Sequence, residues 1–273
     1  MSAVPPTPDE MADFYSAMGS LLQMAWGDNF HFGYWEGPDD TSSVDEATDR
    51  FTDLLTERLR VGSGDRVLDV GCGVGKPAVR LASATGATVL GITVSVEQVE
   101  QATERARAAA MSDQVSFRYA DAMDMPFEDA SFDAVLALES IMHMDRPTAL
   151  REVARVLRPG GRLALTDLMP LAGAAGAAGA AEQSGGIDIA SLTRIEDWPG
   201  LAADAGLALD EVTDVSANIE GTFQRMYDAF VEHGEEFERR YGIAMQQVLD
   251  SINVTSQNAA GPVGCVVVAA HKP

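Results

Sequence analysis

Short apolar runs alternate with amphipathic segments through the middle of the chain, from residue 66 to residue 168. Runs rich in leucine and β-branched residues are typical of strands buried on both faces, whereas apolar residues spaced three and four apart are typical of helices. Such an alternation predicts a parallel sheet with right-handed crossovers. The pattern places strands at 66–70, 88–94, 115–121, 132–138 and 161–168, and helices at 77–85, 96–110 and 147–157.

The segments on either side of this core follow other patterns. Residues 11–26 and 44–59 have apolar positions at helical spacing, and the aromatic segment NFHFGYWEG lies between them, so we expect a helical flap ahead of the sheet. Residues 171–186 are almost wholly alanine and glycine, which suits a hinge or a linker. Beyond them the pattern predicts a helix at 196–206, a strand at 207–216, one or two amphipathic helices over 222–252 and a closing strand at 261–272.

The length of 273 residues and a hydrophobic content of 46% allow one large core with an embellishment. We therefore expect a single domain. The long helical excursion before the last strand would lie over the sheet as a cap, where we place substrate selection. The expected parts are an N-terminal helical flap (1–60), a ligand-binding core (61–170), an Ala/Gly hinge with a substrate cap (171–260) and a closing strand (261–273).

Composition excludes several classes of partner. The formal charge of −23, from 19 basic and 42 acidic residues, repels polyphosphates and acidic membranes, so we expect neither nucleic acid nor a membrane as partner. Simple solubility explains the same charge equally well. The chain shows neither a membrane-length apolar run nor a signal-peptide pattern, which makes the cytoplasm the expected location. Cys72 and Cys265 form no disulfide or metal-ligand pattern, and no metal site is expected.

The most informative stretch is VLDVGCGVGK, residues 67–76, in which a buried strand breaks into three alternating glycines. Gly71, Gly73 and Gly75 let the backbone turn sharply and come close to a ligand. Pro77 suits the first turn of the following helix, whose unpaired N–H groups would point at whatever lies over the loop. Strand, glycine turn and helix together predict a nucleotide-type site; the alternative is a tight connection in an α/β sheet.

Four blocks are similar to the class I S-adenosylmethionine-dependent methyltransferases: HFGYWEG, VLDVGCGVGKPAVRLA, YADAMDMPFEDASFDAV and LREVARVLRPGGRLALTD. More narrowly, they resemble the small-molecule O- and C-methyltransferases of bacterial natural-product pathways, and the resemblance covers nearly the full length. It implies a Rossmann-like α/β fold with a seven-stranded, mostly parallel sheet and helices on both faces. It also implies S-adenosyl-L-methionine as cofactor and S-adenosyl-L-homocysteine as product.

The resemblance assigns the methionine end of the cofactor to the glycine loop. In proteins of this family Asp69 and the Gly71 backbone hold the α-amino group, and Gly73 belongs to the same loop. A zwitterion needs a carboxylate for its ammonium group and N–H groups for its carboxylate, so the assignment is chemically sound. At the end of the second strand, where dinucleotide-binding folds carry an acid for the ribose, the resemblance offers Thr93 and Gln98, which argues against NAD.

Further cofactor contacts are implied at other strand ends. Asp121 would bind the adenine amino group, with Ala122 and Met123 against the ring. The alternative is that Asp121 caps the following turn while Met123 belongs to the core. The implied set also includes Glu139, after the fourth strand, together with Tyr15 and Trp35, which would close over the methionine end unless these aromatics only pack.

Chemistry centres on LESIMHMD, residues 138–145. Transfer to a hydroxyl requires an oriented acceptor and a base for its proton, and His143 is suited to that role because its pKa lies near working pH. Asp167, at the end of the fifth strand, could hold the imidazole; the alternative is a turn cap and a solvated strand end. Sugar O-methyltransferases of this subgroup carry two consecutive histidines after LES, whereas Met142 stands at the first position here, which would make the pocket wall more apolar.

These observations predict an O-methyltransferase that acts on a hydroxyl of a bulky, hydrophobic secondary metabolite such as a polyketide or its glycoside. A cyclase that keeps the cofactor site is the main alternative, because fold and cofactor do not fix the chemistry. C-methylation of a prenyl diphosphate is disfavoured, since the cap has few arginines among many acids. A nucleoside-binding module without activity is the remaining class. Acceptor identity, regiochemistry and oligomeric state, monomer or homo-oligomer, stay open.

Overall fold

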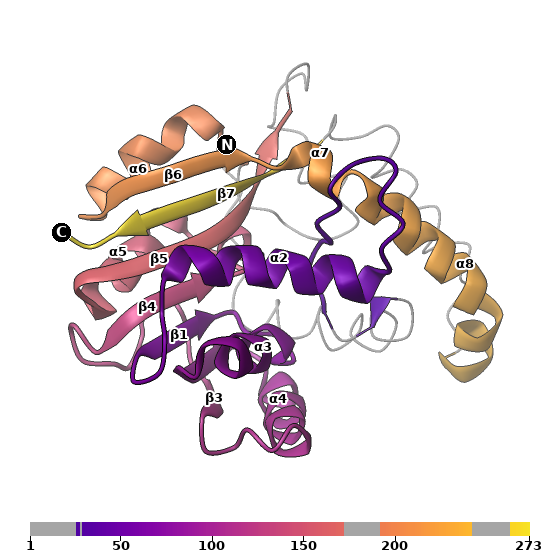
Figure 1. Cartoon of the computed structure of the whole chain (residues 1–273), viewed down its shortest axis with the longest axis horizontal. Helices are drawn as coiled ribbons and strands as arrows, with labels where there is room; N and C mark the ends of the chain where they lie inside the picture. Colours follow the sequence, from indigo (N-terminus) through magenta and orange to yellow (C-terminus); the bar gives the residue numbers. More distant parts are fainter. Residues whose placement is uncertain (1–25, 28, 172–191, 242–262) are drawn as a thin grey trace.

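The computed structural model describes residues 26–27, 29–171, 192–241 and 263–273. Its centre is one seven-stranded sheet in the order β3-β2-β1-β4-β5-β7-β6 (Figure 1). Neighbouring strands from β3 to β5 run parallel, whereas β7 runs antiparallel to both β5 and β6. The predicted mostly parallel, seven-stranded sheet is confirmed. The strands are β1 Arg66–Val70, β2 Thr88–Thr93, β3 Val115–Tyr119, β4 Phe132–Ala137, β5 Leu157–Pro170, β6 Ala208–Asp214 and β7 Val263–His271.

Helices cover both faces of the sheet, as expected. On one face α2 (Val44–Leu59), α3 (Lys76–Thr85) and α4 (Val96–Ala108) contribute to a core that includes Phe51, Leu55 and Leu81. On the other face α5 (Arg146–Val156) and α6 (Trp198–Asp204) enclose the second core cluster. Apolar residues at helical spacing produce this result because each helix can bury only one stripe.

The order of strands determines where a ligand can bind. From β1 the chain proceeds outward through β2 and β3, and then returns to place β4 on the other side of β1. The crossovers on the two sides of this switch point diverge, which leaves a crevice at the carboxyl ends of β1 and β4. Both the glycine loop after β1 and the segment LESIMHMD after β4 begin at this crevice.

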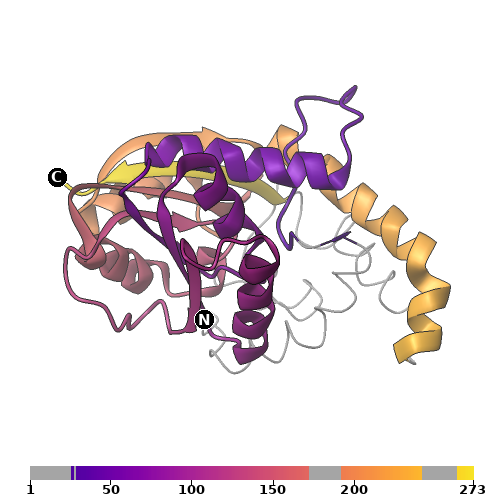
Figure 2. The same ribbon diagram turned by 60° about the horizontal axis from the view of Figure 1, so that its bottom comes forward.

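The predicted excursion before the closing strand contains α7 (Ser216–Ile219) and α8 (Gly221–Tyr241). Figures 1 and 2 show α8 on the side of the sheet where the parallel strands end, running outward past α2. Reciprocal bonds join this region to the N-terminal segment, since Trp35 N donates to Asn218 O at 2.9 Å and Asn218 Nδ2 donates to Trp35 O at 2.8 Å. Residues 11–25 of the predicted flap, most of the Ala/Gly segment and residues 242–252 lie outside the described residues.

None of the helices that the structure describes has the length and hydrophobicity needed to span a bilayer.

Candidate active site

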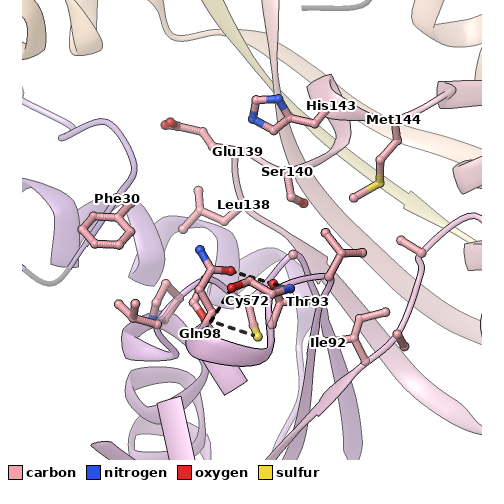
Figure 3. A pocket seen from close by; sticks show the side chains of 18 of the residues that line it. Phe30, Cys72, Ile92, Thr93, Gln98, Leu138, Glu139, Ser140, His143 and Met144 are labelled. Atoms are coloured by element: carbon pink, nitrogen blue, oxygen red, sulfur yellow. Dashed lines mark hydrogen bonds between the residues drawn. The ribbon is translucent and has the colours of Figure 1, made fainter. Parts of the chain in front are cut away.

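A pocket opens at the carboxyl ends of β1 to β4, between the glycine loop and the segment that follows β4 (Figure 3). It brings together residues from five stretches of sequence that are far apart in the chain. The lining consists of Phe30 and His31, residues 71–74 and Pro77, residues 92–95 and Gln98, residues 120–123, and residues 138–140 with His143 and Met144.

The glycine loop forms the floor of this pocket. Gly71 and Gly73 have φ of +71° and +52°, backbone conformations that residues with a side chain rarely adopt. A Cβ on Gly71 would lie 2.3 Å from Ser140 Cβ, so this glycine is required by packing between the ends of β1 and β4. A Cβ on Gly73 would meet no atom within 4 Å. Gly73 therefore borders open space, as a residue in contact with a ligand should.

Asp69 is the second-last residue of β1, just before this loop. It is 2% exposed, its Oδ2 has no hydrogen-bond partner among the described residues, and burial raises the pKa of its carboxyl to about 7. Gly71 N donates to Ile92 O at 2.9 Å, so the carbonyl is the backbone group of Gly71 that could accept a hydrogen bond from a ligand. An ammonium group nearby would satisfy both oxygens, so the pair fits the role expected for it, although Asp69 itself is not among the residues that line the pocket.

Thr93 and Gln98 form a buried polar pair at the end of β2. Thr93 Oγ1 donates to Gln98 Oε1 at 2.6 Å, and Ser95 N donates to Thr93 Oγ1 at 3.2 Å. With its oxygen engaged, the Gln98 amide has its NH₂ group left for a ligand. Both residues line the pocket, where neutral donors can meet hydroxyl groups.

The segment after β3 supplies the opposite side. Asp121 Oδ1 accepts a hydrogen bond from Met123 N at 2.8 Å, so Asp121 does cap the turn, and it lines the pocket as well. Met123 is only half-buried and also lines the pocket, whereas Ala122 is buried. One Asp121 oxygen thus stabilises the turn, while the residue also lines the pocket.

Glu139 links the N-terminal segment to the sheet. Its Oε1 accepts a hydrogen bond from Phe32 N at 2.7 Å, and its own N–H donates to Thr166 Oγ1 at 2.8 Å. Its backbone has φ of +49°, an uncommon conformation for a residue with a side chain and one that clusters at functional sites. Burial raises the pKa of Glu139 to about 8 despite the hydrogen bond from Phe32.

His143 lies on the same side of the pocket as Glu139, across from the glycine loop (Figure 3). It ends η1, a short 3₁₀ helix over Ile141–His143. Burial lowers the pKa of His143 to about 4, and the positive charge of Arg146 acts in the same direction. The pKa of His143 therefore lies below the working pH near which the sequence placed it; the lowered pKa favours the neutral imidazole, the form that accepts a proton, but makes it a weaker base.

Asp167 has a different partner from the one considered in the sequence. It is fully buried, and both carboxylate oxygens accept from the Arg146 guanidinium: Nε lies 2.5 Å from Oδ2 and Nη2 lies 2.8 Å from Oδ1. Leu168 N also donates to Oδ1 at 2.8 Å. Burial raises the pKa of this carboxyl, and Arg146 opposes that shift. No hydrogen bond joins Asp167 to His143, although the structure describes both residues.

Trp35 and Met142, like Asp69 and Asp167, are not part of the pocket lining. Trp35 is 3% exposed and packs against Trp26 and Ala47, with the guanidinium carbon of Arg225 4.3 Å from the ring centroid, so its ring is buried by packing and does not reach the pocket. Met142 is buried behind the wall, and Met144 lines the pocket instead.

Tyr15 lies outside the described residues. Phe30 and His31, which sequence reasoning did not assign to the site, occupy the place expected for the flap aromatics. The only signal for them was membership of the segment NFHFGYWEG, whose aromatics look alike in sequence.

The sheet order, the glycine loop and the pocket at the switch point define an α/β protein that binds a nucleoside-type cofactor. Residues 68–165 match the family model described as "Methyltransferase domain". The chain is 40% identical over 272 residues, 98% of each chain, to 27-O-demethylrifamycin SV methyltransferase of Amycolatopsis mediterranei (strain S699). It is 46% identical over 225 residues, 81% of each chain, to methyltransferase GfsG of Streptomyces halstedii.

Among solved structures, the [4+2]-cyclase SpnF superposes with a TM-score of 0.87 at 32% identity, over 100% of this chain and 98% of that one. The chain belongs to the class I S-adenosylmethionine-dependent methyltransferases of natural-product pathways. It is a methyltransferase enzyme, and its cofactor is S-adenosylmethionine. The orphaned Asp69 oxygen and the open space over Gly73 fit that cofactor.

Proposed function

We propose that this enzyme methylates a hydroxyl group of a bulky, largely apolar secondary metabolite, a polyketide or its glycoside, with His143 as general base. The observation that carries the proposal is the place of His143, whose imidazole lies in the wall of the cofactor pocket, where burial lowers its pKa and favours the neutral form. A neutral imidazole accepts the proton of a hydroxyl as the oxygen becomes a nucleophile. The similarity to the 27-O-demethylrifamycin SV methyltransferase of Amycolatopsis mediterranei supports the same acceptor class.

Cofactor residues would divide the work along the molecule. Asp69 and the Gly71 carbonyl would hold the ammonium group, Thr93 with Gln98 the ribose hydroxyls, and Asp121 the adenine amino group. Ala122 and Met123 would lie against the adenine ring. Glu139 would support the methionine end from the β4 side.

The bound cofactor supplies a methyl group already activated on a sulfonium, so the protein needs no metal or covalent intermediate for this step. With the cofactor bound, the acceptor oxygen would take the methyl carbon as the carbon–sulfur bond breaks, and the electron pair of that bond would stay on sulfur. His143 takes the proton from the acceptor oxygen. Positioning contributes the remainder, since in-line displacement requires oxygen, carbon and sulfur to be aligned.

Apolar side chains near His143 suit a large hydrophobic acceptor. Phe30, Leu138 and Met144 line the pocket beside the polar groups that would hold the cofactor. An apolar wall with a few polar groups is the usual composition of a small-molecule site. Met144 thus takes the role that the sequence suggested for Met142.

The test begins with calorimetric binding of S-adenosylhomocysteine and continues with methyl transfer to hydroxylated polyketides and their glycosides, detected by mass. His143→Ala should lower turnover about 10²–10⁴-fold, the usual contribution of a general base, with unchanged cofactor affinity. His271→Ala is the matched control, because His271 lies at the far end of β7, paired with Asp210 at 2.9 Å. Unchanged turnover in His143→Ala would refute the role.

A cyclase function is the second candidate, because the [4+2]-cyclase SpnF has the same fold. The same apolar pocket could fold a polyene while the cofactor acts as a structural element. Product mass separates the two: methylation adds one CH₂ equivalent, whereas cyclisation leaves the mass unchanged.

A further inference from the structure

A buried ion pair connects β5 to the turn that carries His143. Arg146 and Asp167 are 5% and 0% exposed, and two parallel hydrogen bonds of 2.5 and 2.8 Å join them. The planar guanidinium matches a carboxylate in this two-point geometry, which fixes direction as well as distance. Burying two charges is expensive and adds little net stability compared with apolar residues, so stability alone does not account for the pair.

The pair anchors one end of the His143 turn. Arg146 is the first residue of α5, three positions after His143, and its side chain reaches back to β5. The other end is anchored by Ser140, whose Oγ donates to Val70 O at 2.6 Å at the end of β1. Between these anchors His143 N donates to Ser140 O at 3.1 Å. The imidazole is thus carried on a short turn fixed to two strands.

We propose that Arg146 is a positioning residue of the methyl-transfer site: it couples Asp167 to the turn that carries His143, so that Asp167 acts on the imidazole through the guanidinium and not by a direct hydrogen bond. This inference rests on the proposed role of His143 as base. It revises the simple His–Asp pairing expected from the sequence, because both Asp167 oxygens already accept from Arg146.

Electrostatics agree with this geometry. Among the described residues, Glu139 after β4 and His31 from the N-terminal segment line the pocket with His143, the charge of Arg146 on α5 acts on the imidazole, and Asp167 on β5 is paired with Arg146. Burial, and after it the charge of Arg146, lowers the pKa of His143, whereas a carboxylate in direct contact would raise it. The charge of Arg146 thus favours the neutral imidazole, which can accept a proton, while Asp167 balances the buried positive charge.

Kinetics test the coupling through four variants: Arg146→Gln, Arg146→Lys, Asp167→Asn and the double variant Arg146→Gln/Asp167→Asn. Misplacing a catalytic group by about 1 Å lowers rates about 10²-fold, so Arg146→Gln should lower kcat by about that factor at unchanged cofactor affinity. Arg146→Lys keeps the positive charge but not the two-point geometry of the guanidinium, so it should recover only part of the lost kcat. If Asp167 acts through Arg146, the double variant is no slower than Arg146→Gln; a loss equal to the product of the two single losses would overturn the proposal.

A second measurement needs no acceptor and neither of the single variants of the buried ion pair. The chain has only 4 histidines, so the ring nitrogens of His143 can be assigned by NMR with His143→Gln and titrated from pH 8 to about pH 5.5. We expect a neutral imidazole throughout in the wild type, and an upward shift of its titration in the double variant, which leaves no buried charge. The proposal would be overturned if the measured pKa of wild-type His143 lay above its ordinary value and the imidazole formed a hydrogen bond with Asp167. Absence of methyl transfer in the wild type would instead refute the proposed function and leave this result standing.

Discussion

Replacing Gly73 by alanine should separate backbone strain from contact with the cofactor. Gly73 has φ of +52°, and a Cβ built there meets no protein atom within 4 Å. The left-handed conformation costs a residue with a side chain roughly 1–2 kcal/mol. For a chain of this size that corresponds to a fall in Tm of about 2–8 °C. The added methyl group enters the space where the cofactor is expected, so affinity for S-adenosylhomocysteine should fall well beyond this small loss of stability.

Two other glycines provide the comparison. Gly206→Ala has the same kind of strain, since Gly206 has φ of +80° with nothing within 4 Å, but it lies after α6 and does not line the pocket. Gly71→Ala adds a collision at 2.3 Å with Ser140 Cβ, and overpacking of that kind costs about 1–3 kcal/mol more. Thermal stability should therefore fall most in Gly71→Ala and by similar, smaller amounts in the other two.

Calorimetric titration with S-adenosylhomocysteine and thermal unfolding of the three variants make the assay. We expect Kd to rise at least tenfold in Gly73→Ala, about 1.4 kcal/mol, and to stay at the wild-type value in Gly206→Ala. If these two variants bind equally well, the cofactor does not lie against Gly73, and the reasoning from the open space above it is wrong.

Three further predictions concern the polar groups around the pocket. Burial raises the pKa of Asp69 to about 7 in the folded protein without ligand, so this carboxyl makes the free energy of unfolding fall as pH rises from about 4 to 7. Asp69→Asn should flatten this pH dependence in thermal unfolding. Cofactor binding to the wild type at pH 6 should release a proton, which calorimetry would detect as a binding enthalpy that depends on the buffer. Thr93→Val removes the hydroxyl that orients Gln98, and should raise the KM for S-adenosylmethionine several-fold with kcat unchanged, since about 1 kcal/mol of hydrogen bonding is lost. Arg225→Ala removes the cation over Trp35 and should lower the free energy of unfolding by about 1 kcal/mol while the affinity for the cofactor stays unchanged. A loss of binding free energy as large as the loss of stability would mean that Trp35 does reach the cofactor.

The strands and the two helical layers follow from local pattern. Apolar runs such as RVLDV and FDAVLA have no polar face, so a strand made of them must be covered on both sides, and the amphipathic helices supply the cover. The direction of β7, by contrast, could not be predicted from local sequence pattern. VGCVVVAAH is apolar whether it runs parallel or antiparallel, and only its pairing with β5 and β6 decides.

The cofactor side of the pocket was predictable for a related reason. Its residues follow strand ends directly, so the sheet itself brings Thr93 and Asp121 to the crevice. The aromatic segment has no such support. The Trp35 backbone is held by hydrogen bonds with Asn218, 183 positions away, and its ring packs against Trp26 and Ala47, while Phe30 and His31 line the pocket.

The partner of Asp167 shows where chemical reasoning can extend the pattern. A carboxylate with no exposed surface needs a cation that keeps its charge when buried. Burial suppresses the charge of an imidazole, whose pKa lies near 6.5, whereas a guanidinium remains protonated under any condition a protein meets. Of the two basic residues near the start of α5, His143 and Arg146, only the arginine meets that requirement, and the arginine takes both oxygens. The same burial that keeps His143 from pairing with Asp167 as a cation keeps it neutral in the pocket wall, which is the state that a base for a hydroxyl proton requires.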